Sequence, residues 1–222
     1  MRIRYEEKYH KGVHAPLITN ELYYWVRTNL ALLRYFDDIK KNQKVFEFGC
    51  GLGQNIFLLP NAIGYDISKF CLKFAKKKGI KIITNIKDIK NDSFDVVLCS
   101  HVLEHVENPY KILKILKNKL KVGGKLILIL PIENHGKINF DLDINQHLYC
   151  WNFRTINNLL ITMKFKVIEN KYIRGGTSSK LTNLFFSIFP LKRSYLILYN
   201  SLCKLASIIL GTKEMKIVAI KV

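Results

Sequence analysis

The most constraining feature of this sequence is a series of short, almost unbroken apolar runs that alternate with amphipathic segments of helical period. The clearest runs are FDVVLCS at 94–100 and KLILIL at 125–130. Such runs indicate strands covered on both faces, because a strand exposed on one face alternates apolar and polar residues. Strands of this kind belong to parallel sheets joined by right-handed helical crossovers. The chain is therefore predicted to form a doubly wound, mainly parallel α/β sheet.

The same patterns predict the order of the elements. Strands are expected at 45–48, 62–66, 80–84, 94–100 and 125–130, with a sixth near 166–168 and a last one at 215–221. Helices are expected at about 20–36, from the glycine-rich turn to residue 59, and at 69–78, 109–120 and 153–163. Thr19 or Asn20 is expected to cap the first helix and Asn152 the last, and residues 123–124 to form a turn.

Composition narrows the functional classes. The 222 residues are 49% hydrophobic and carry a net charge of +19, which excludes a disordered chain and suits one large domain or a domain with an appendage. The charge indicates an anionic partner, nucleic acid or a membrane surface. Because Arg makes up only seven of the 36 basic residues, a solvated basic face is favoured over a dedicated nucleic-acid surface.

Two further inferences concern the environment of the protein. The five cysteines are scattered and form no CxxC pair, which predicts reduced thiols and no zinc site. The polar start of the sequence contains no secretory signal, so a cytoplasmic location is expected.

Residues 181–210 depart from the alternating pattern, because they are largely apolar and carry only Lys192, Arg193 and Lys204 as charges. No uninterrupted apolar run reaches the length of a membrane span, and Pro190 divides the segment. We therefore expect two amphipathic helices within an insertion at about 177–211, before the last strand. Three interpretations remain open: the helices cap the substrate end of the sheet, mediate self-association, or lie on a membrane surface.

A glycine-rich turn follows the first expected strand. Residues 47–54 read EFGCGLGQ, and glycines at a strand-to-helix turn let the backbone approach a ligand closely. Asp66 ends the second strand 17 positions after Gly49, where a carboxylate is placed to accept both hydroxyls of a ribose. The sequence therefore predicts a cofactor that contains a sugar.

With these residues in view, the sequence resembles the class I S-adenosylmethionine-dependent methyltransferases. The resemblance runs from about residue 43 to 171 and rests on VFEFGCGLGQN at 45–55, GYDIS at 64–68, SFDVVLCSHVLEHVENP at 93–109, LKVGGKLILILP at 120–131 and HLYCWNFRTINNLL at 147–160. It is strongest to the small-molecule branch that includes quinone-biosynthesis O-methyltransferases. It implies a Rossmann-like methyltransferase domain at 43–222, preceded by an N-terminal segment and helix at 1–42.

The resemblance also implies roles for individual residues. Glu47 would orient the amino group of S-adenosylmethionine, and Asp66 would bind its ribose. Asn85 stands where many members have Asp beside the adenine amino group. The full set of implied cofactor-binding residues is Glu47, Gly49, Cys50, Gly51, Gly53, Asp66, Ile67, Asn85, Ile86 and Cys99.

The catalytic residues are less sharply indicated. Methyl transfer from a sulfonium is an in-line displacement, so the protein mainly aligns the reactants and excludes water. A base is useful where the acceptor must lose a proton, and His101 and His105 follow the fourth strand at the edge where such folds bind ligands. His147 and Tyr149 follow the fifth strand and are candidates for substrate contact.

Some of these histidines and tyrosines have structural alternatives. Glu104 and His105 form a pair whose role in similar proteins is often structural, and Tyr149 can equally anchor the next helix. The N-terminal Tyr9, His10 and His14 belong either to a lid over the cofactor or to a disordered tail. No metal site is expected, because Asp141 and Asp143 have no recognisable spacing to a third ligand.

These observations predict an S-adenosylmethionine-dependent methyltransferase that acts on a small or lipid-linked acceptor. Two alternatives remain open: the acceptor is RNA, or the chain is a catalytically silent binding module that keeps the fold. Oligomeric state is not indicated by the sequence.

Overall fold

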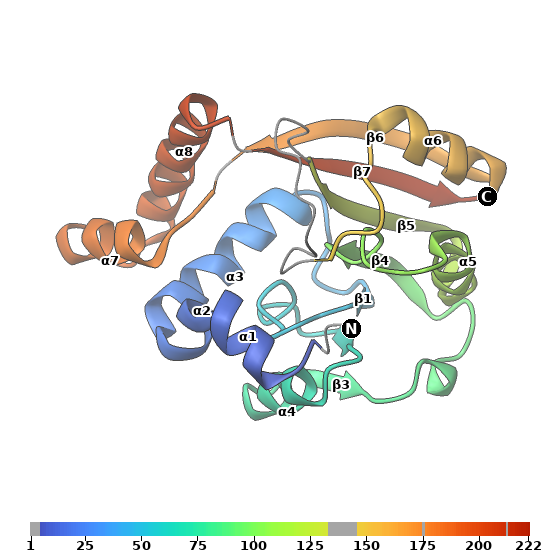
Figure 1. The fold of residues 1–222 in the computed structure, drawn as a ribbon, viewed down its shortest axis with the longest axis horizontal. Helices are drawn as coiled ribbons and strands as arrows, with labels where there is room; N and C mark the ends of the chain where they lie inside the picture. Colours follow the sequence, from blue (N-terminus) through green and yellow to red (C-terminus); the bar gives the residue numbers. More distant parts are fainter. Residues whose placement is uncertain (1–4, 133–145, 175, 212) are drawn as a thin grey trace.

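The computed structural model describes residues 5–132, 146–174, 176–211 and 213–222, and its centre is one seven-stranded sheet (Figure 1). The strand order is β3-β2-β1-β4-β5-β7-β6. The first five strands are parallel, whereas β7 runs antiparallel to both β5 and β6. The strands are β1 Val45–Phe48, β2 Ala62–Tyr65, β3 Lys81–Ile83, β4 Phe94–Ser100, β5 Leu120–Pro131, β6 Phe165–Arg174 and β7 Lys213–Lys221.

Helices cover both faces of this sheet, as the apolar runs require. Alternate residues of β4 enter different clusters: Val97 packs with α5 and α6, and Val96 packs with α3 and α4. Because both faces are buried, the mainly parallel α/β fold is confirmed. The helices are α1 Glu7–Val13, α2 Ala15–Thr19, α3 Glu21–Tyr35, α4 Lys69–Lys77, α5 Pro109–Lys119, α6 Phe153–Thr162, α7 Ser179–Ile188 and α8 Arg193–Ile209, with a 3₁₀ turn at Ile86–Asp88.

The expected helix caps are present. The side chain of Asn20 accepts a hydrogen bond from the Tyr23 amide at the start of α3. Asn152 forms a reciprocal capping box with Thr155 at the start of α6. Each cap satisfies amides that the first helical turn leaves without partners.

The prediction of a helix between the glycine turn and residue 59 is wrong. This segment forms successive turns, in which the Ile56 amide donates to Gly53 and the Leu59 amide donates to Ile56. Each hydrogen bond spans three residues rather than four, and Pro60 supplies no amide to extend the series. The glycine loop is therefore held by turns and not by the N-terminus of a regular helix.

The strands at the far side of the sheet are longer than predicted. The turn expected at Gly123-Gly124 is instead an irregularity inside β5, where Gly123 has a φ of +76°. The register with β4 shifts there, because Phe94 pairs with Leu120 whereas Val96 pairs with Lys125. β6 extends to Arg174, well past the expected 168, since pairing with β7 supports it.

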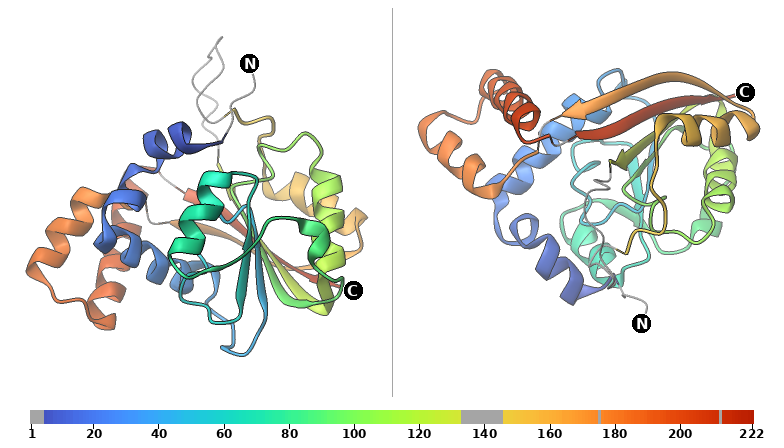
Figure 2. Two further views of the ribbon diagram at one scale, coloured as in Figure 1. Left: turned by 90° about the horizontal axis from the view of Figure 1, so that it is seen from below. Right: turned by 45° about the horizontal axis from the view of Figure 1, so that its top comes forward.

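The apolar segment forms two helices, as predicted, with Pro190 in the connection between them. Both views in Figure 2 place α7 and α8 beside α3 at one end of the molecule, away from α5 and α6. The inward face of α8 contributes Leu196, Tyr199 and Cys203 to a cluster with Val26 and Leu30 of α3. None of the helices in the described residues is long and apolar enough to cross a membrane.

Residues 5–19, for which the sequence predicts no helix or strand, contain the short helices α1 and α2. Pro16 lies in the first turn of α2, a position that suits proline because the amide there has no helical partner. Tyr24, in the first turns of the next helix, donates its hydroxyl proton to the carbonyl of Leu52 in the glycine loop. The N-terminal helices thus lead into contacts with the loops at the carboxyl edge of the sheet.

Candidate cofactor and active site

The glycine turn after β1 has a backbone that side chains rarely adopt. The φ angles of Gly49, Gly51 and Gly53 are +77°, +52° and +80°. A Cβ at Gly49 would lie 2.2 Å from Val102, and one at Gly53 would lie 2.1 Å from Ile80, whereas one at Gly51 would meet no protein atom within 4 Å. Gly49 and Gly53 are therefore required for packing, and Gly51 leaves open space beside the backbone.

Asp66, directly after β2, holds this turn in place. One carboxylate oxygen accepts the Gly51 amide at 2.8 Å, and the other accepts the Ser68 amide at 2.8 Å. Each oxygen keeps a second lone pair, so the half-buried carboxylate retains the capacity to accept two hydroxyl protons. This donor and acceptor arrangement fits the ribose that the sequence predicted.

Glu47 is a buried carboxyl group at the centre of the site. It is fully buried in β1, and one oxygen accepts a hydrogen bond of 2.7 Å from the Asn55 side chain. The second oxygen has no hydrogen-bond partner within the described residues. Burial raises the pKa of Glu47 to about 8, because the hydrogen bond from Asn55 offsets only part of the desolvation.

These observations test whether S-adenosylmethionine fits the edge of the sheet. A buried carboxyl oxygen without a partner suits an ammonium group, and the open space at Gly51 suits the close approach of a ligand. Ile67, beside Asp66, is 69% exposed and offers an apolar surface for a planar ring. The residues present therefore fit the amino group, ribose and base of the cofactor.

Four further predicted cofactor residues lie in different surroundings. Asn85 is exposed, and its side-chain oxygen accepts the Lys87 amide at the start of the 3₁₀ turn. Ile86 is partly buried and packs against the main core. Cys50 and Cys99 are buried, with Cys99 inside the main hydrophobic cluster rather than at the open edge. Cys50 is thus placed to contribute backbone, and Cys99 is a core residue.

The N-terminal segment joins two sides of this site through consecutive residues. The Glu6 carboxylate accepts hydrogen bonds from the Ser68 hydroxyl and the Phe70 amide, each at 3.3 Å, at the start of α4. The Tyr5 hydroxyl lies 3.1 Å from Nδ1 of His105. Sequence reasoning singled out Tyr9, His10 and His14 but missed Tyr5 and Glu6, because a single polar residue in an aperiodic segment carries no signal of a partner 62 or 100 positions away.

His101 lies between two carboxyl groups. Its Nδ1 is 3.4 Å from Glu104 and its Nε2 is 3.2 Å from Glu214. Desolvation lowers the pKa of His101, but the interactions with the Glu104 and Glu214 carboxyl groups outweigh it and raise the pKa to about 10. An imidazolium has no free lone pair, so this geometry does not suit the base that the sequence suggested.

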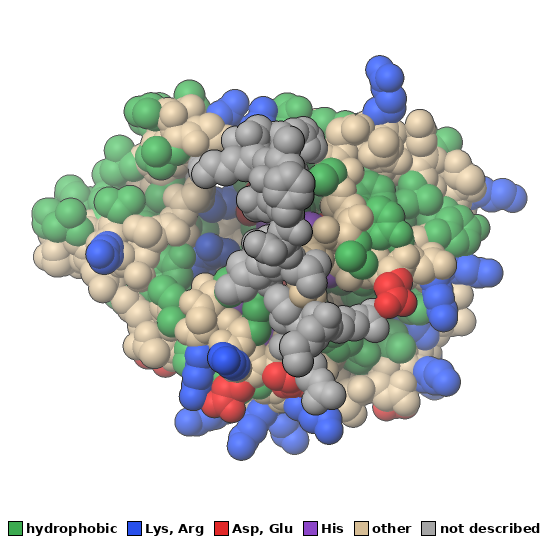
Figure 3. Space-filling view, in the orientation of Figure 1, with side chains coloured by type: hydrophobic (Ala, Val, Ile, Leu, Met, Phe, Trp, Pro, Cys, Tyr) green, Lys and Arg blue, Asp and Glu red, His purple; other side chains and the backbone are tan. Residues whose placement is uncertain are grey.

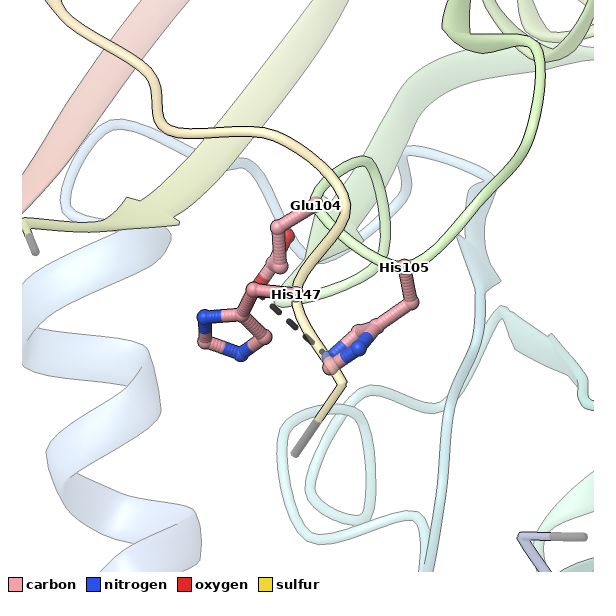
Figure 4. Close-up of side chains that lie close together, drawn as sticks. All are labelled: Glu104, His105 and His147. Carbon is pink, nitrogen blue, oxygen red and sulfur yellow. Dashed lines mark ion pairs between the residues drawn. The ribbon is translucent and has the colours of Figure 1, made fainter. Parts of the chain in front are cut away.

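His105, Glu104 and His147 form a cluster beside it (Figure 4). The His105 and His147 rings are 4.7 Å apart between centroids and edge-to-face, and the buried Glu104 lies 3.9 Å from Nε2 of His105. One ligand atom from each residue lies within 4.8 Å of the others, a spacing able to hold a metal ion. This group could not be predicted from the sequence, because His147 lies 42 positions after His105. Asp141 and Asp143 lie outside the described residues.

Tyr149 and the residues next to it close this edge. The amides of Leu148 and Tyr149 both donate to the Glu104 carbonyl, at 2.7 and 3.3 Å. The Tyr149 hydroxyl donates to the Glu107 carbonyl at 2.9 Å, and its ring stacks on Trp151. These contacts tie the segment after β5 to the loop after β4. His147 thereby lies beside His105, whereas the hydroxyl of Tyr149 is used in an internal contact.

Comparison with known proteins finds relatives of this chain. A family model described as a methyltransferase domain matches residues 24–170. The uncharacterised protein MJ0638 of Methanocaldococcus jannaschii is 33% identical over 172 residues, which cover 76% of this chain and 72% of that protein. A ubiquinone biosynthesis O-methyltransferase of Idiomarina loihiensis is 33% identical over 127 residues, which cover 49% of this chain and 51% of that enzyme.

A solved structure shares the fold. The crystal structure of an S-adenosylmethionine-dependent methyltransferase from Archaeoglobus fulgidus superimposes with a TM-score of 0.60 over 88% of this chain and 94% of that chain. The sequence identity is 23%, so the likeness concerns the fold alone.

Proposed function

The chain belongs to the class I methyltransferases, which take their methyl group from S-adenosylmethionine, and we propose that it transfers this group to a small or lipid-linked acceptor. The observation that carries the proposal is the arrangement of Glu47, Gly51 and Asp66 at one edge of the sheet, joined by Tyr5 and Glu6 to His105. A cofactor site and a titratable group thus lie under the same N-terminal segment.

Each proposed cofactor contact follows from the chemistry of its group. Glu47 binds the ammonium of the methionine part, and the backbone at Gly49, Cys50 and Gly51 lines that part. Asp66 accepts the ribose hydroxyls, while Ile67 and Ile86 contact the adenine from either side and Asn85 reaches its amino group. When bound, S-adenosylmethionine supplies an electrophilic methyl carbon on a sulfonium. We also propose that the chain consists of a methyltransferase domain at 43–222 and an N-terminal segment at 1–42 that acts as a lid over the cofactor.

His105 is the residue best placed to accept a proton from the acceptor. Its Nδ1 faces the Tyr5 hydroxyl, so a tautomer that accepts the tyrosine proton at Nδ1 carries its own proton at Nε2. When an acceptor replaces the tyrosine hydroxyl at Nδ1, or relays its proton through that hydroxyl, the imidazole becomes the base. His101 is already held as a cation by two carboxyl groups and serves to position Glu104. His147, against the His105 ring, contacts the acceptor.

The acceptor class is proposed from the apolar segment. An acceptor with a lipid tail needs an apolar surface near the site, and α7 is joined to the N-terminal segment by a hydrogen bond of 3.0 Å between Asn20 and Asn183. The two helices carry many exposed leucines and isoleucines. We infer a protein that is peripheral to the cytoplasmic side of a membrane when it meets its acceptor.

The test separates the three acceptor classes directly. The protein is incubated with S-adenosylmethionine labelled in its methyl group and, separately, with the lipid extract, the aqueous small-molecule pool and the total RNA of the same cells. Label in a lipid or small molecule supports the proposal, and Asp66→Ala should reduce that label at a subsaturating concentration of S-adenosylmethionine. Label in RNA alone overturns it in favour of an RNA methyltransferase, and the absence of label together with absent binding of S-adenosylhomocysteine favours a silent module.

A further inference from the structure

The outward surface of α7 and α8 carries a row of exposed apolar side chains, and we define this row as the apolar face. On α8, Leu198, Leu202, Leu205 and Ile209 follow at intervals of four, three and four residues, which places them on one side of a helix. Their exposed fractions run from 43% to 86%. On α7, the exposed residues at the same helical spacing are Leu181, Leu184 and Ile188.

This face is separate from the surface that attaches α8 to the rest of the protein. The attached surface consists of Leu196, Tyr199, Asn200, Cys203 and Ser207, all of which are buried. Figure 3 shows hydrophobic side chains gathered at the end of the molecule where α7 and α8 lie. An exposed apolar surface of this continuity is uncommon on a monomer that has no partner for it.

The charge around the apolar face has one sign. Residues 170–213 contain no Asp or Glu, although they contain seven Lys and Arg. Lys180, Lys192, Arg193 and Lys204 are exposed, and none of these four forms an ion pair within the residues that the structure describes. A helical pair with an apolar face and only positive charges is the composition that binds the surface of anionic membranes.

We propose that α7 and α8 dock on the surface of an anionic lipid bilayer, with the apolar face at the boundary of headgroups and acyl chains. The four exposed bases then lie among the lipid phosphates. A second copy of the chain is the less favoured occupant, because two such faces would bring like charges together with no carboxylate to offset them. The inference rests on the proposed function only in naming the acceptor as lipid-linked, because docking itself requires no methyl transfer.

Docking would place the active site near the membrane through contacts between the start of α7 and the start of α3. Thr177, just before α7, lies 3.2 Å from the Tyr23 hydroxyl, and Asn183 bonds to Asn20 at the start of α3. The helix that carries Tyr23 follows directly on α1 and α2, which lead to Tyr5 and Glu6 at the cofactor edge. These contacts connect α7 to the N-terminal segment that contacts His105.

The experiment measures co-sedimentation of the full chain with vesicles. Vesicles of phosphatidylcholine alone are compared with vesicles in which about a third of the lipid is phosphatidylglycerol. The expected result is binding to the anionic vesicles only. Leu202→Glu with Leu205→Glu should weaken it at least about tenfold, since both side chains would enter the acyl boundary. Lys192→Gln with Arg193→Gln should weaken binding to the anionic vesicles roughly 25-fold, because each positive charge contributes about fivefold.

The matched control is Ile161→Glu on α6, where the side chain is 60% exposed like that of Leu205. It should leave vesicle binding unchanged. Equal binding of the wild type and the Leu202/Leu205 variant to the anionic vesicles overturns the proposal. Failure of the wild type to bind these vesicles also overturns it. A wild type that is dimeric in ultracentrifugation and becomes monomeric in that variant overturns it in favour of self-association. Titration with S-adenosylhomocysteine reports the cofactor site separately, so failure of docking is distinguishable from failure of the proposed function.

Discussion

The sharpest test of the cofactor site is Gly51→Ala. Gly51 has a φ of +52°, and a Cβ added there meets no protein atom within 4 Å. A left-handed conformation costs an ordinary residue about 1–2 kcal/mol, and a more restricted unfolded chain returns about 0.4–1 kcal/mol. The free energy of unfolding should therefore fall by only about 1 kcal/mol, which lowers the melting temperature of a chain of this length by about 2–4 °C.

The effect on cofactor binding should be much larger. The new methyl group would occupy the space through which the backbone approaches the methionine part, and overpacking of one methyl group costs about 1–3 kcal/mol. Calorimetric titration with S-adenosylhomocysteine should thus show a dissociation constant roughly 10 to 100 times higher than that of the wild type. Thermal unfolding of the same samples shows whether the protein remains folded.

Gly79→Ala is the matched control. Gly79 lies between α4 and β3 with a φ of +84°, and a Cβ there also meets nothing within 4 Å. It should lose similar stability and keep full affinity for S-adenosylhomocysteine. Equal affinities for the Gly51 and Gly79 variants would refute the placement of the cofactor at the glycine turn. Gly53→Ala should instead impair folding, because its Cβ would lie 2.1 Å from Ile80.

Three other substitutions and one control probe the remaining groups. Asp66→Ala should weaken binding of S-adenosylhomocysteine by about 1–3 kcal/mol, whereas Asp38→Ala, which breaks an ion pair with Lys125, should not change the affinity measured by titration. Since the pKa of Glu47 is raised to about 8 by burial, the carboxyl is protonated near pH 7 and must ionise to bind an ammonium. The affinity for S-adenosylhomocysteine should therefore increase as the pH rises towards 8. The free energy of unfolding should decrease from about pH 4.5 to 8, because the folded state holds a proton that the unfolded state releases. Glu47→Gln should remove both trends, measured by calorimetric titration and by thermal unfolding. His105→Gln should reduce turnover of the acceptor about 10²–10⁴-fold with little change in cofactor affinity, a split that equal losses of both would contradict.

The local parts of the fold could be predicted because short-range rules fix them. FDVVLCS at 94–100 is a strand of the same length in the structure, since its apolar run admits only a position buried on both faces. Asn152 caps α6 because the amide three residues later needs an acceptor. By contrast, the segment after Gly53 has a helical composition but forms turns, because Asp66 and the Tyr65 carbonyl fix the preceding backbone from outside the segment.

The candidate site divides in the same way. Glu47, Gly51 and Asp66 could be identified from sequence, since each lies within a few residues of a strand end. The pairing of Tyr5 with His105 and of Glu6 with the start of α4 could not, because both contacts depend on how a distant segment folds over the sheet. His101 looked like a base by its position, but Glu214, 113 positions away, holds it as a cation.

The topology also allows the α7–α8 excursion to be removed without opening the sheet. Arg174 at the end of β6 pairs with Lys213 at the start of β7, so the intervening residues leave and return at neighbouring positions. An Asn-Gly turn can replace 175–212, because two-residue turns of this type join antiparallel strands. Removal of α8 would expose Val26 and Leu30 of α3, and Val26→Thr and Leu30→Gln would make this newly exposed surface polar.

This shortened protein should keep the cofactor site, because β1, the glycine turn and Asp66 lie at the parallel side of the sheet. Its affinity for S-adenosylhomocysteine should remain within about threefold of the wild-type value, since the described hydrogen-bond partners of Glu47, Gly51 and Asp66 all lie outside the removed segment. Transfer of the labelled methyl group to the lipid extract should be lost. An equal loss of cofactor affinity and transfer would show instead that α7 and α8 support the catalytic fold, and would remove the separation between the cofactor edge and the acceptor surface on which the proposed function depends.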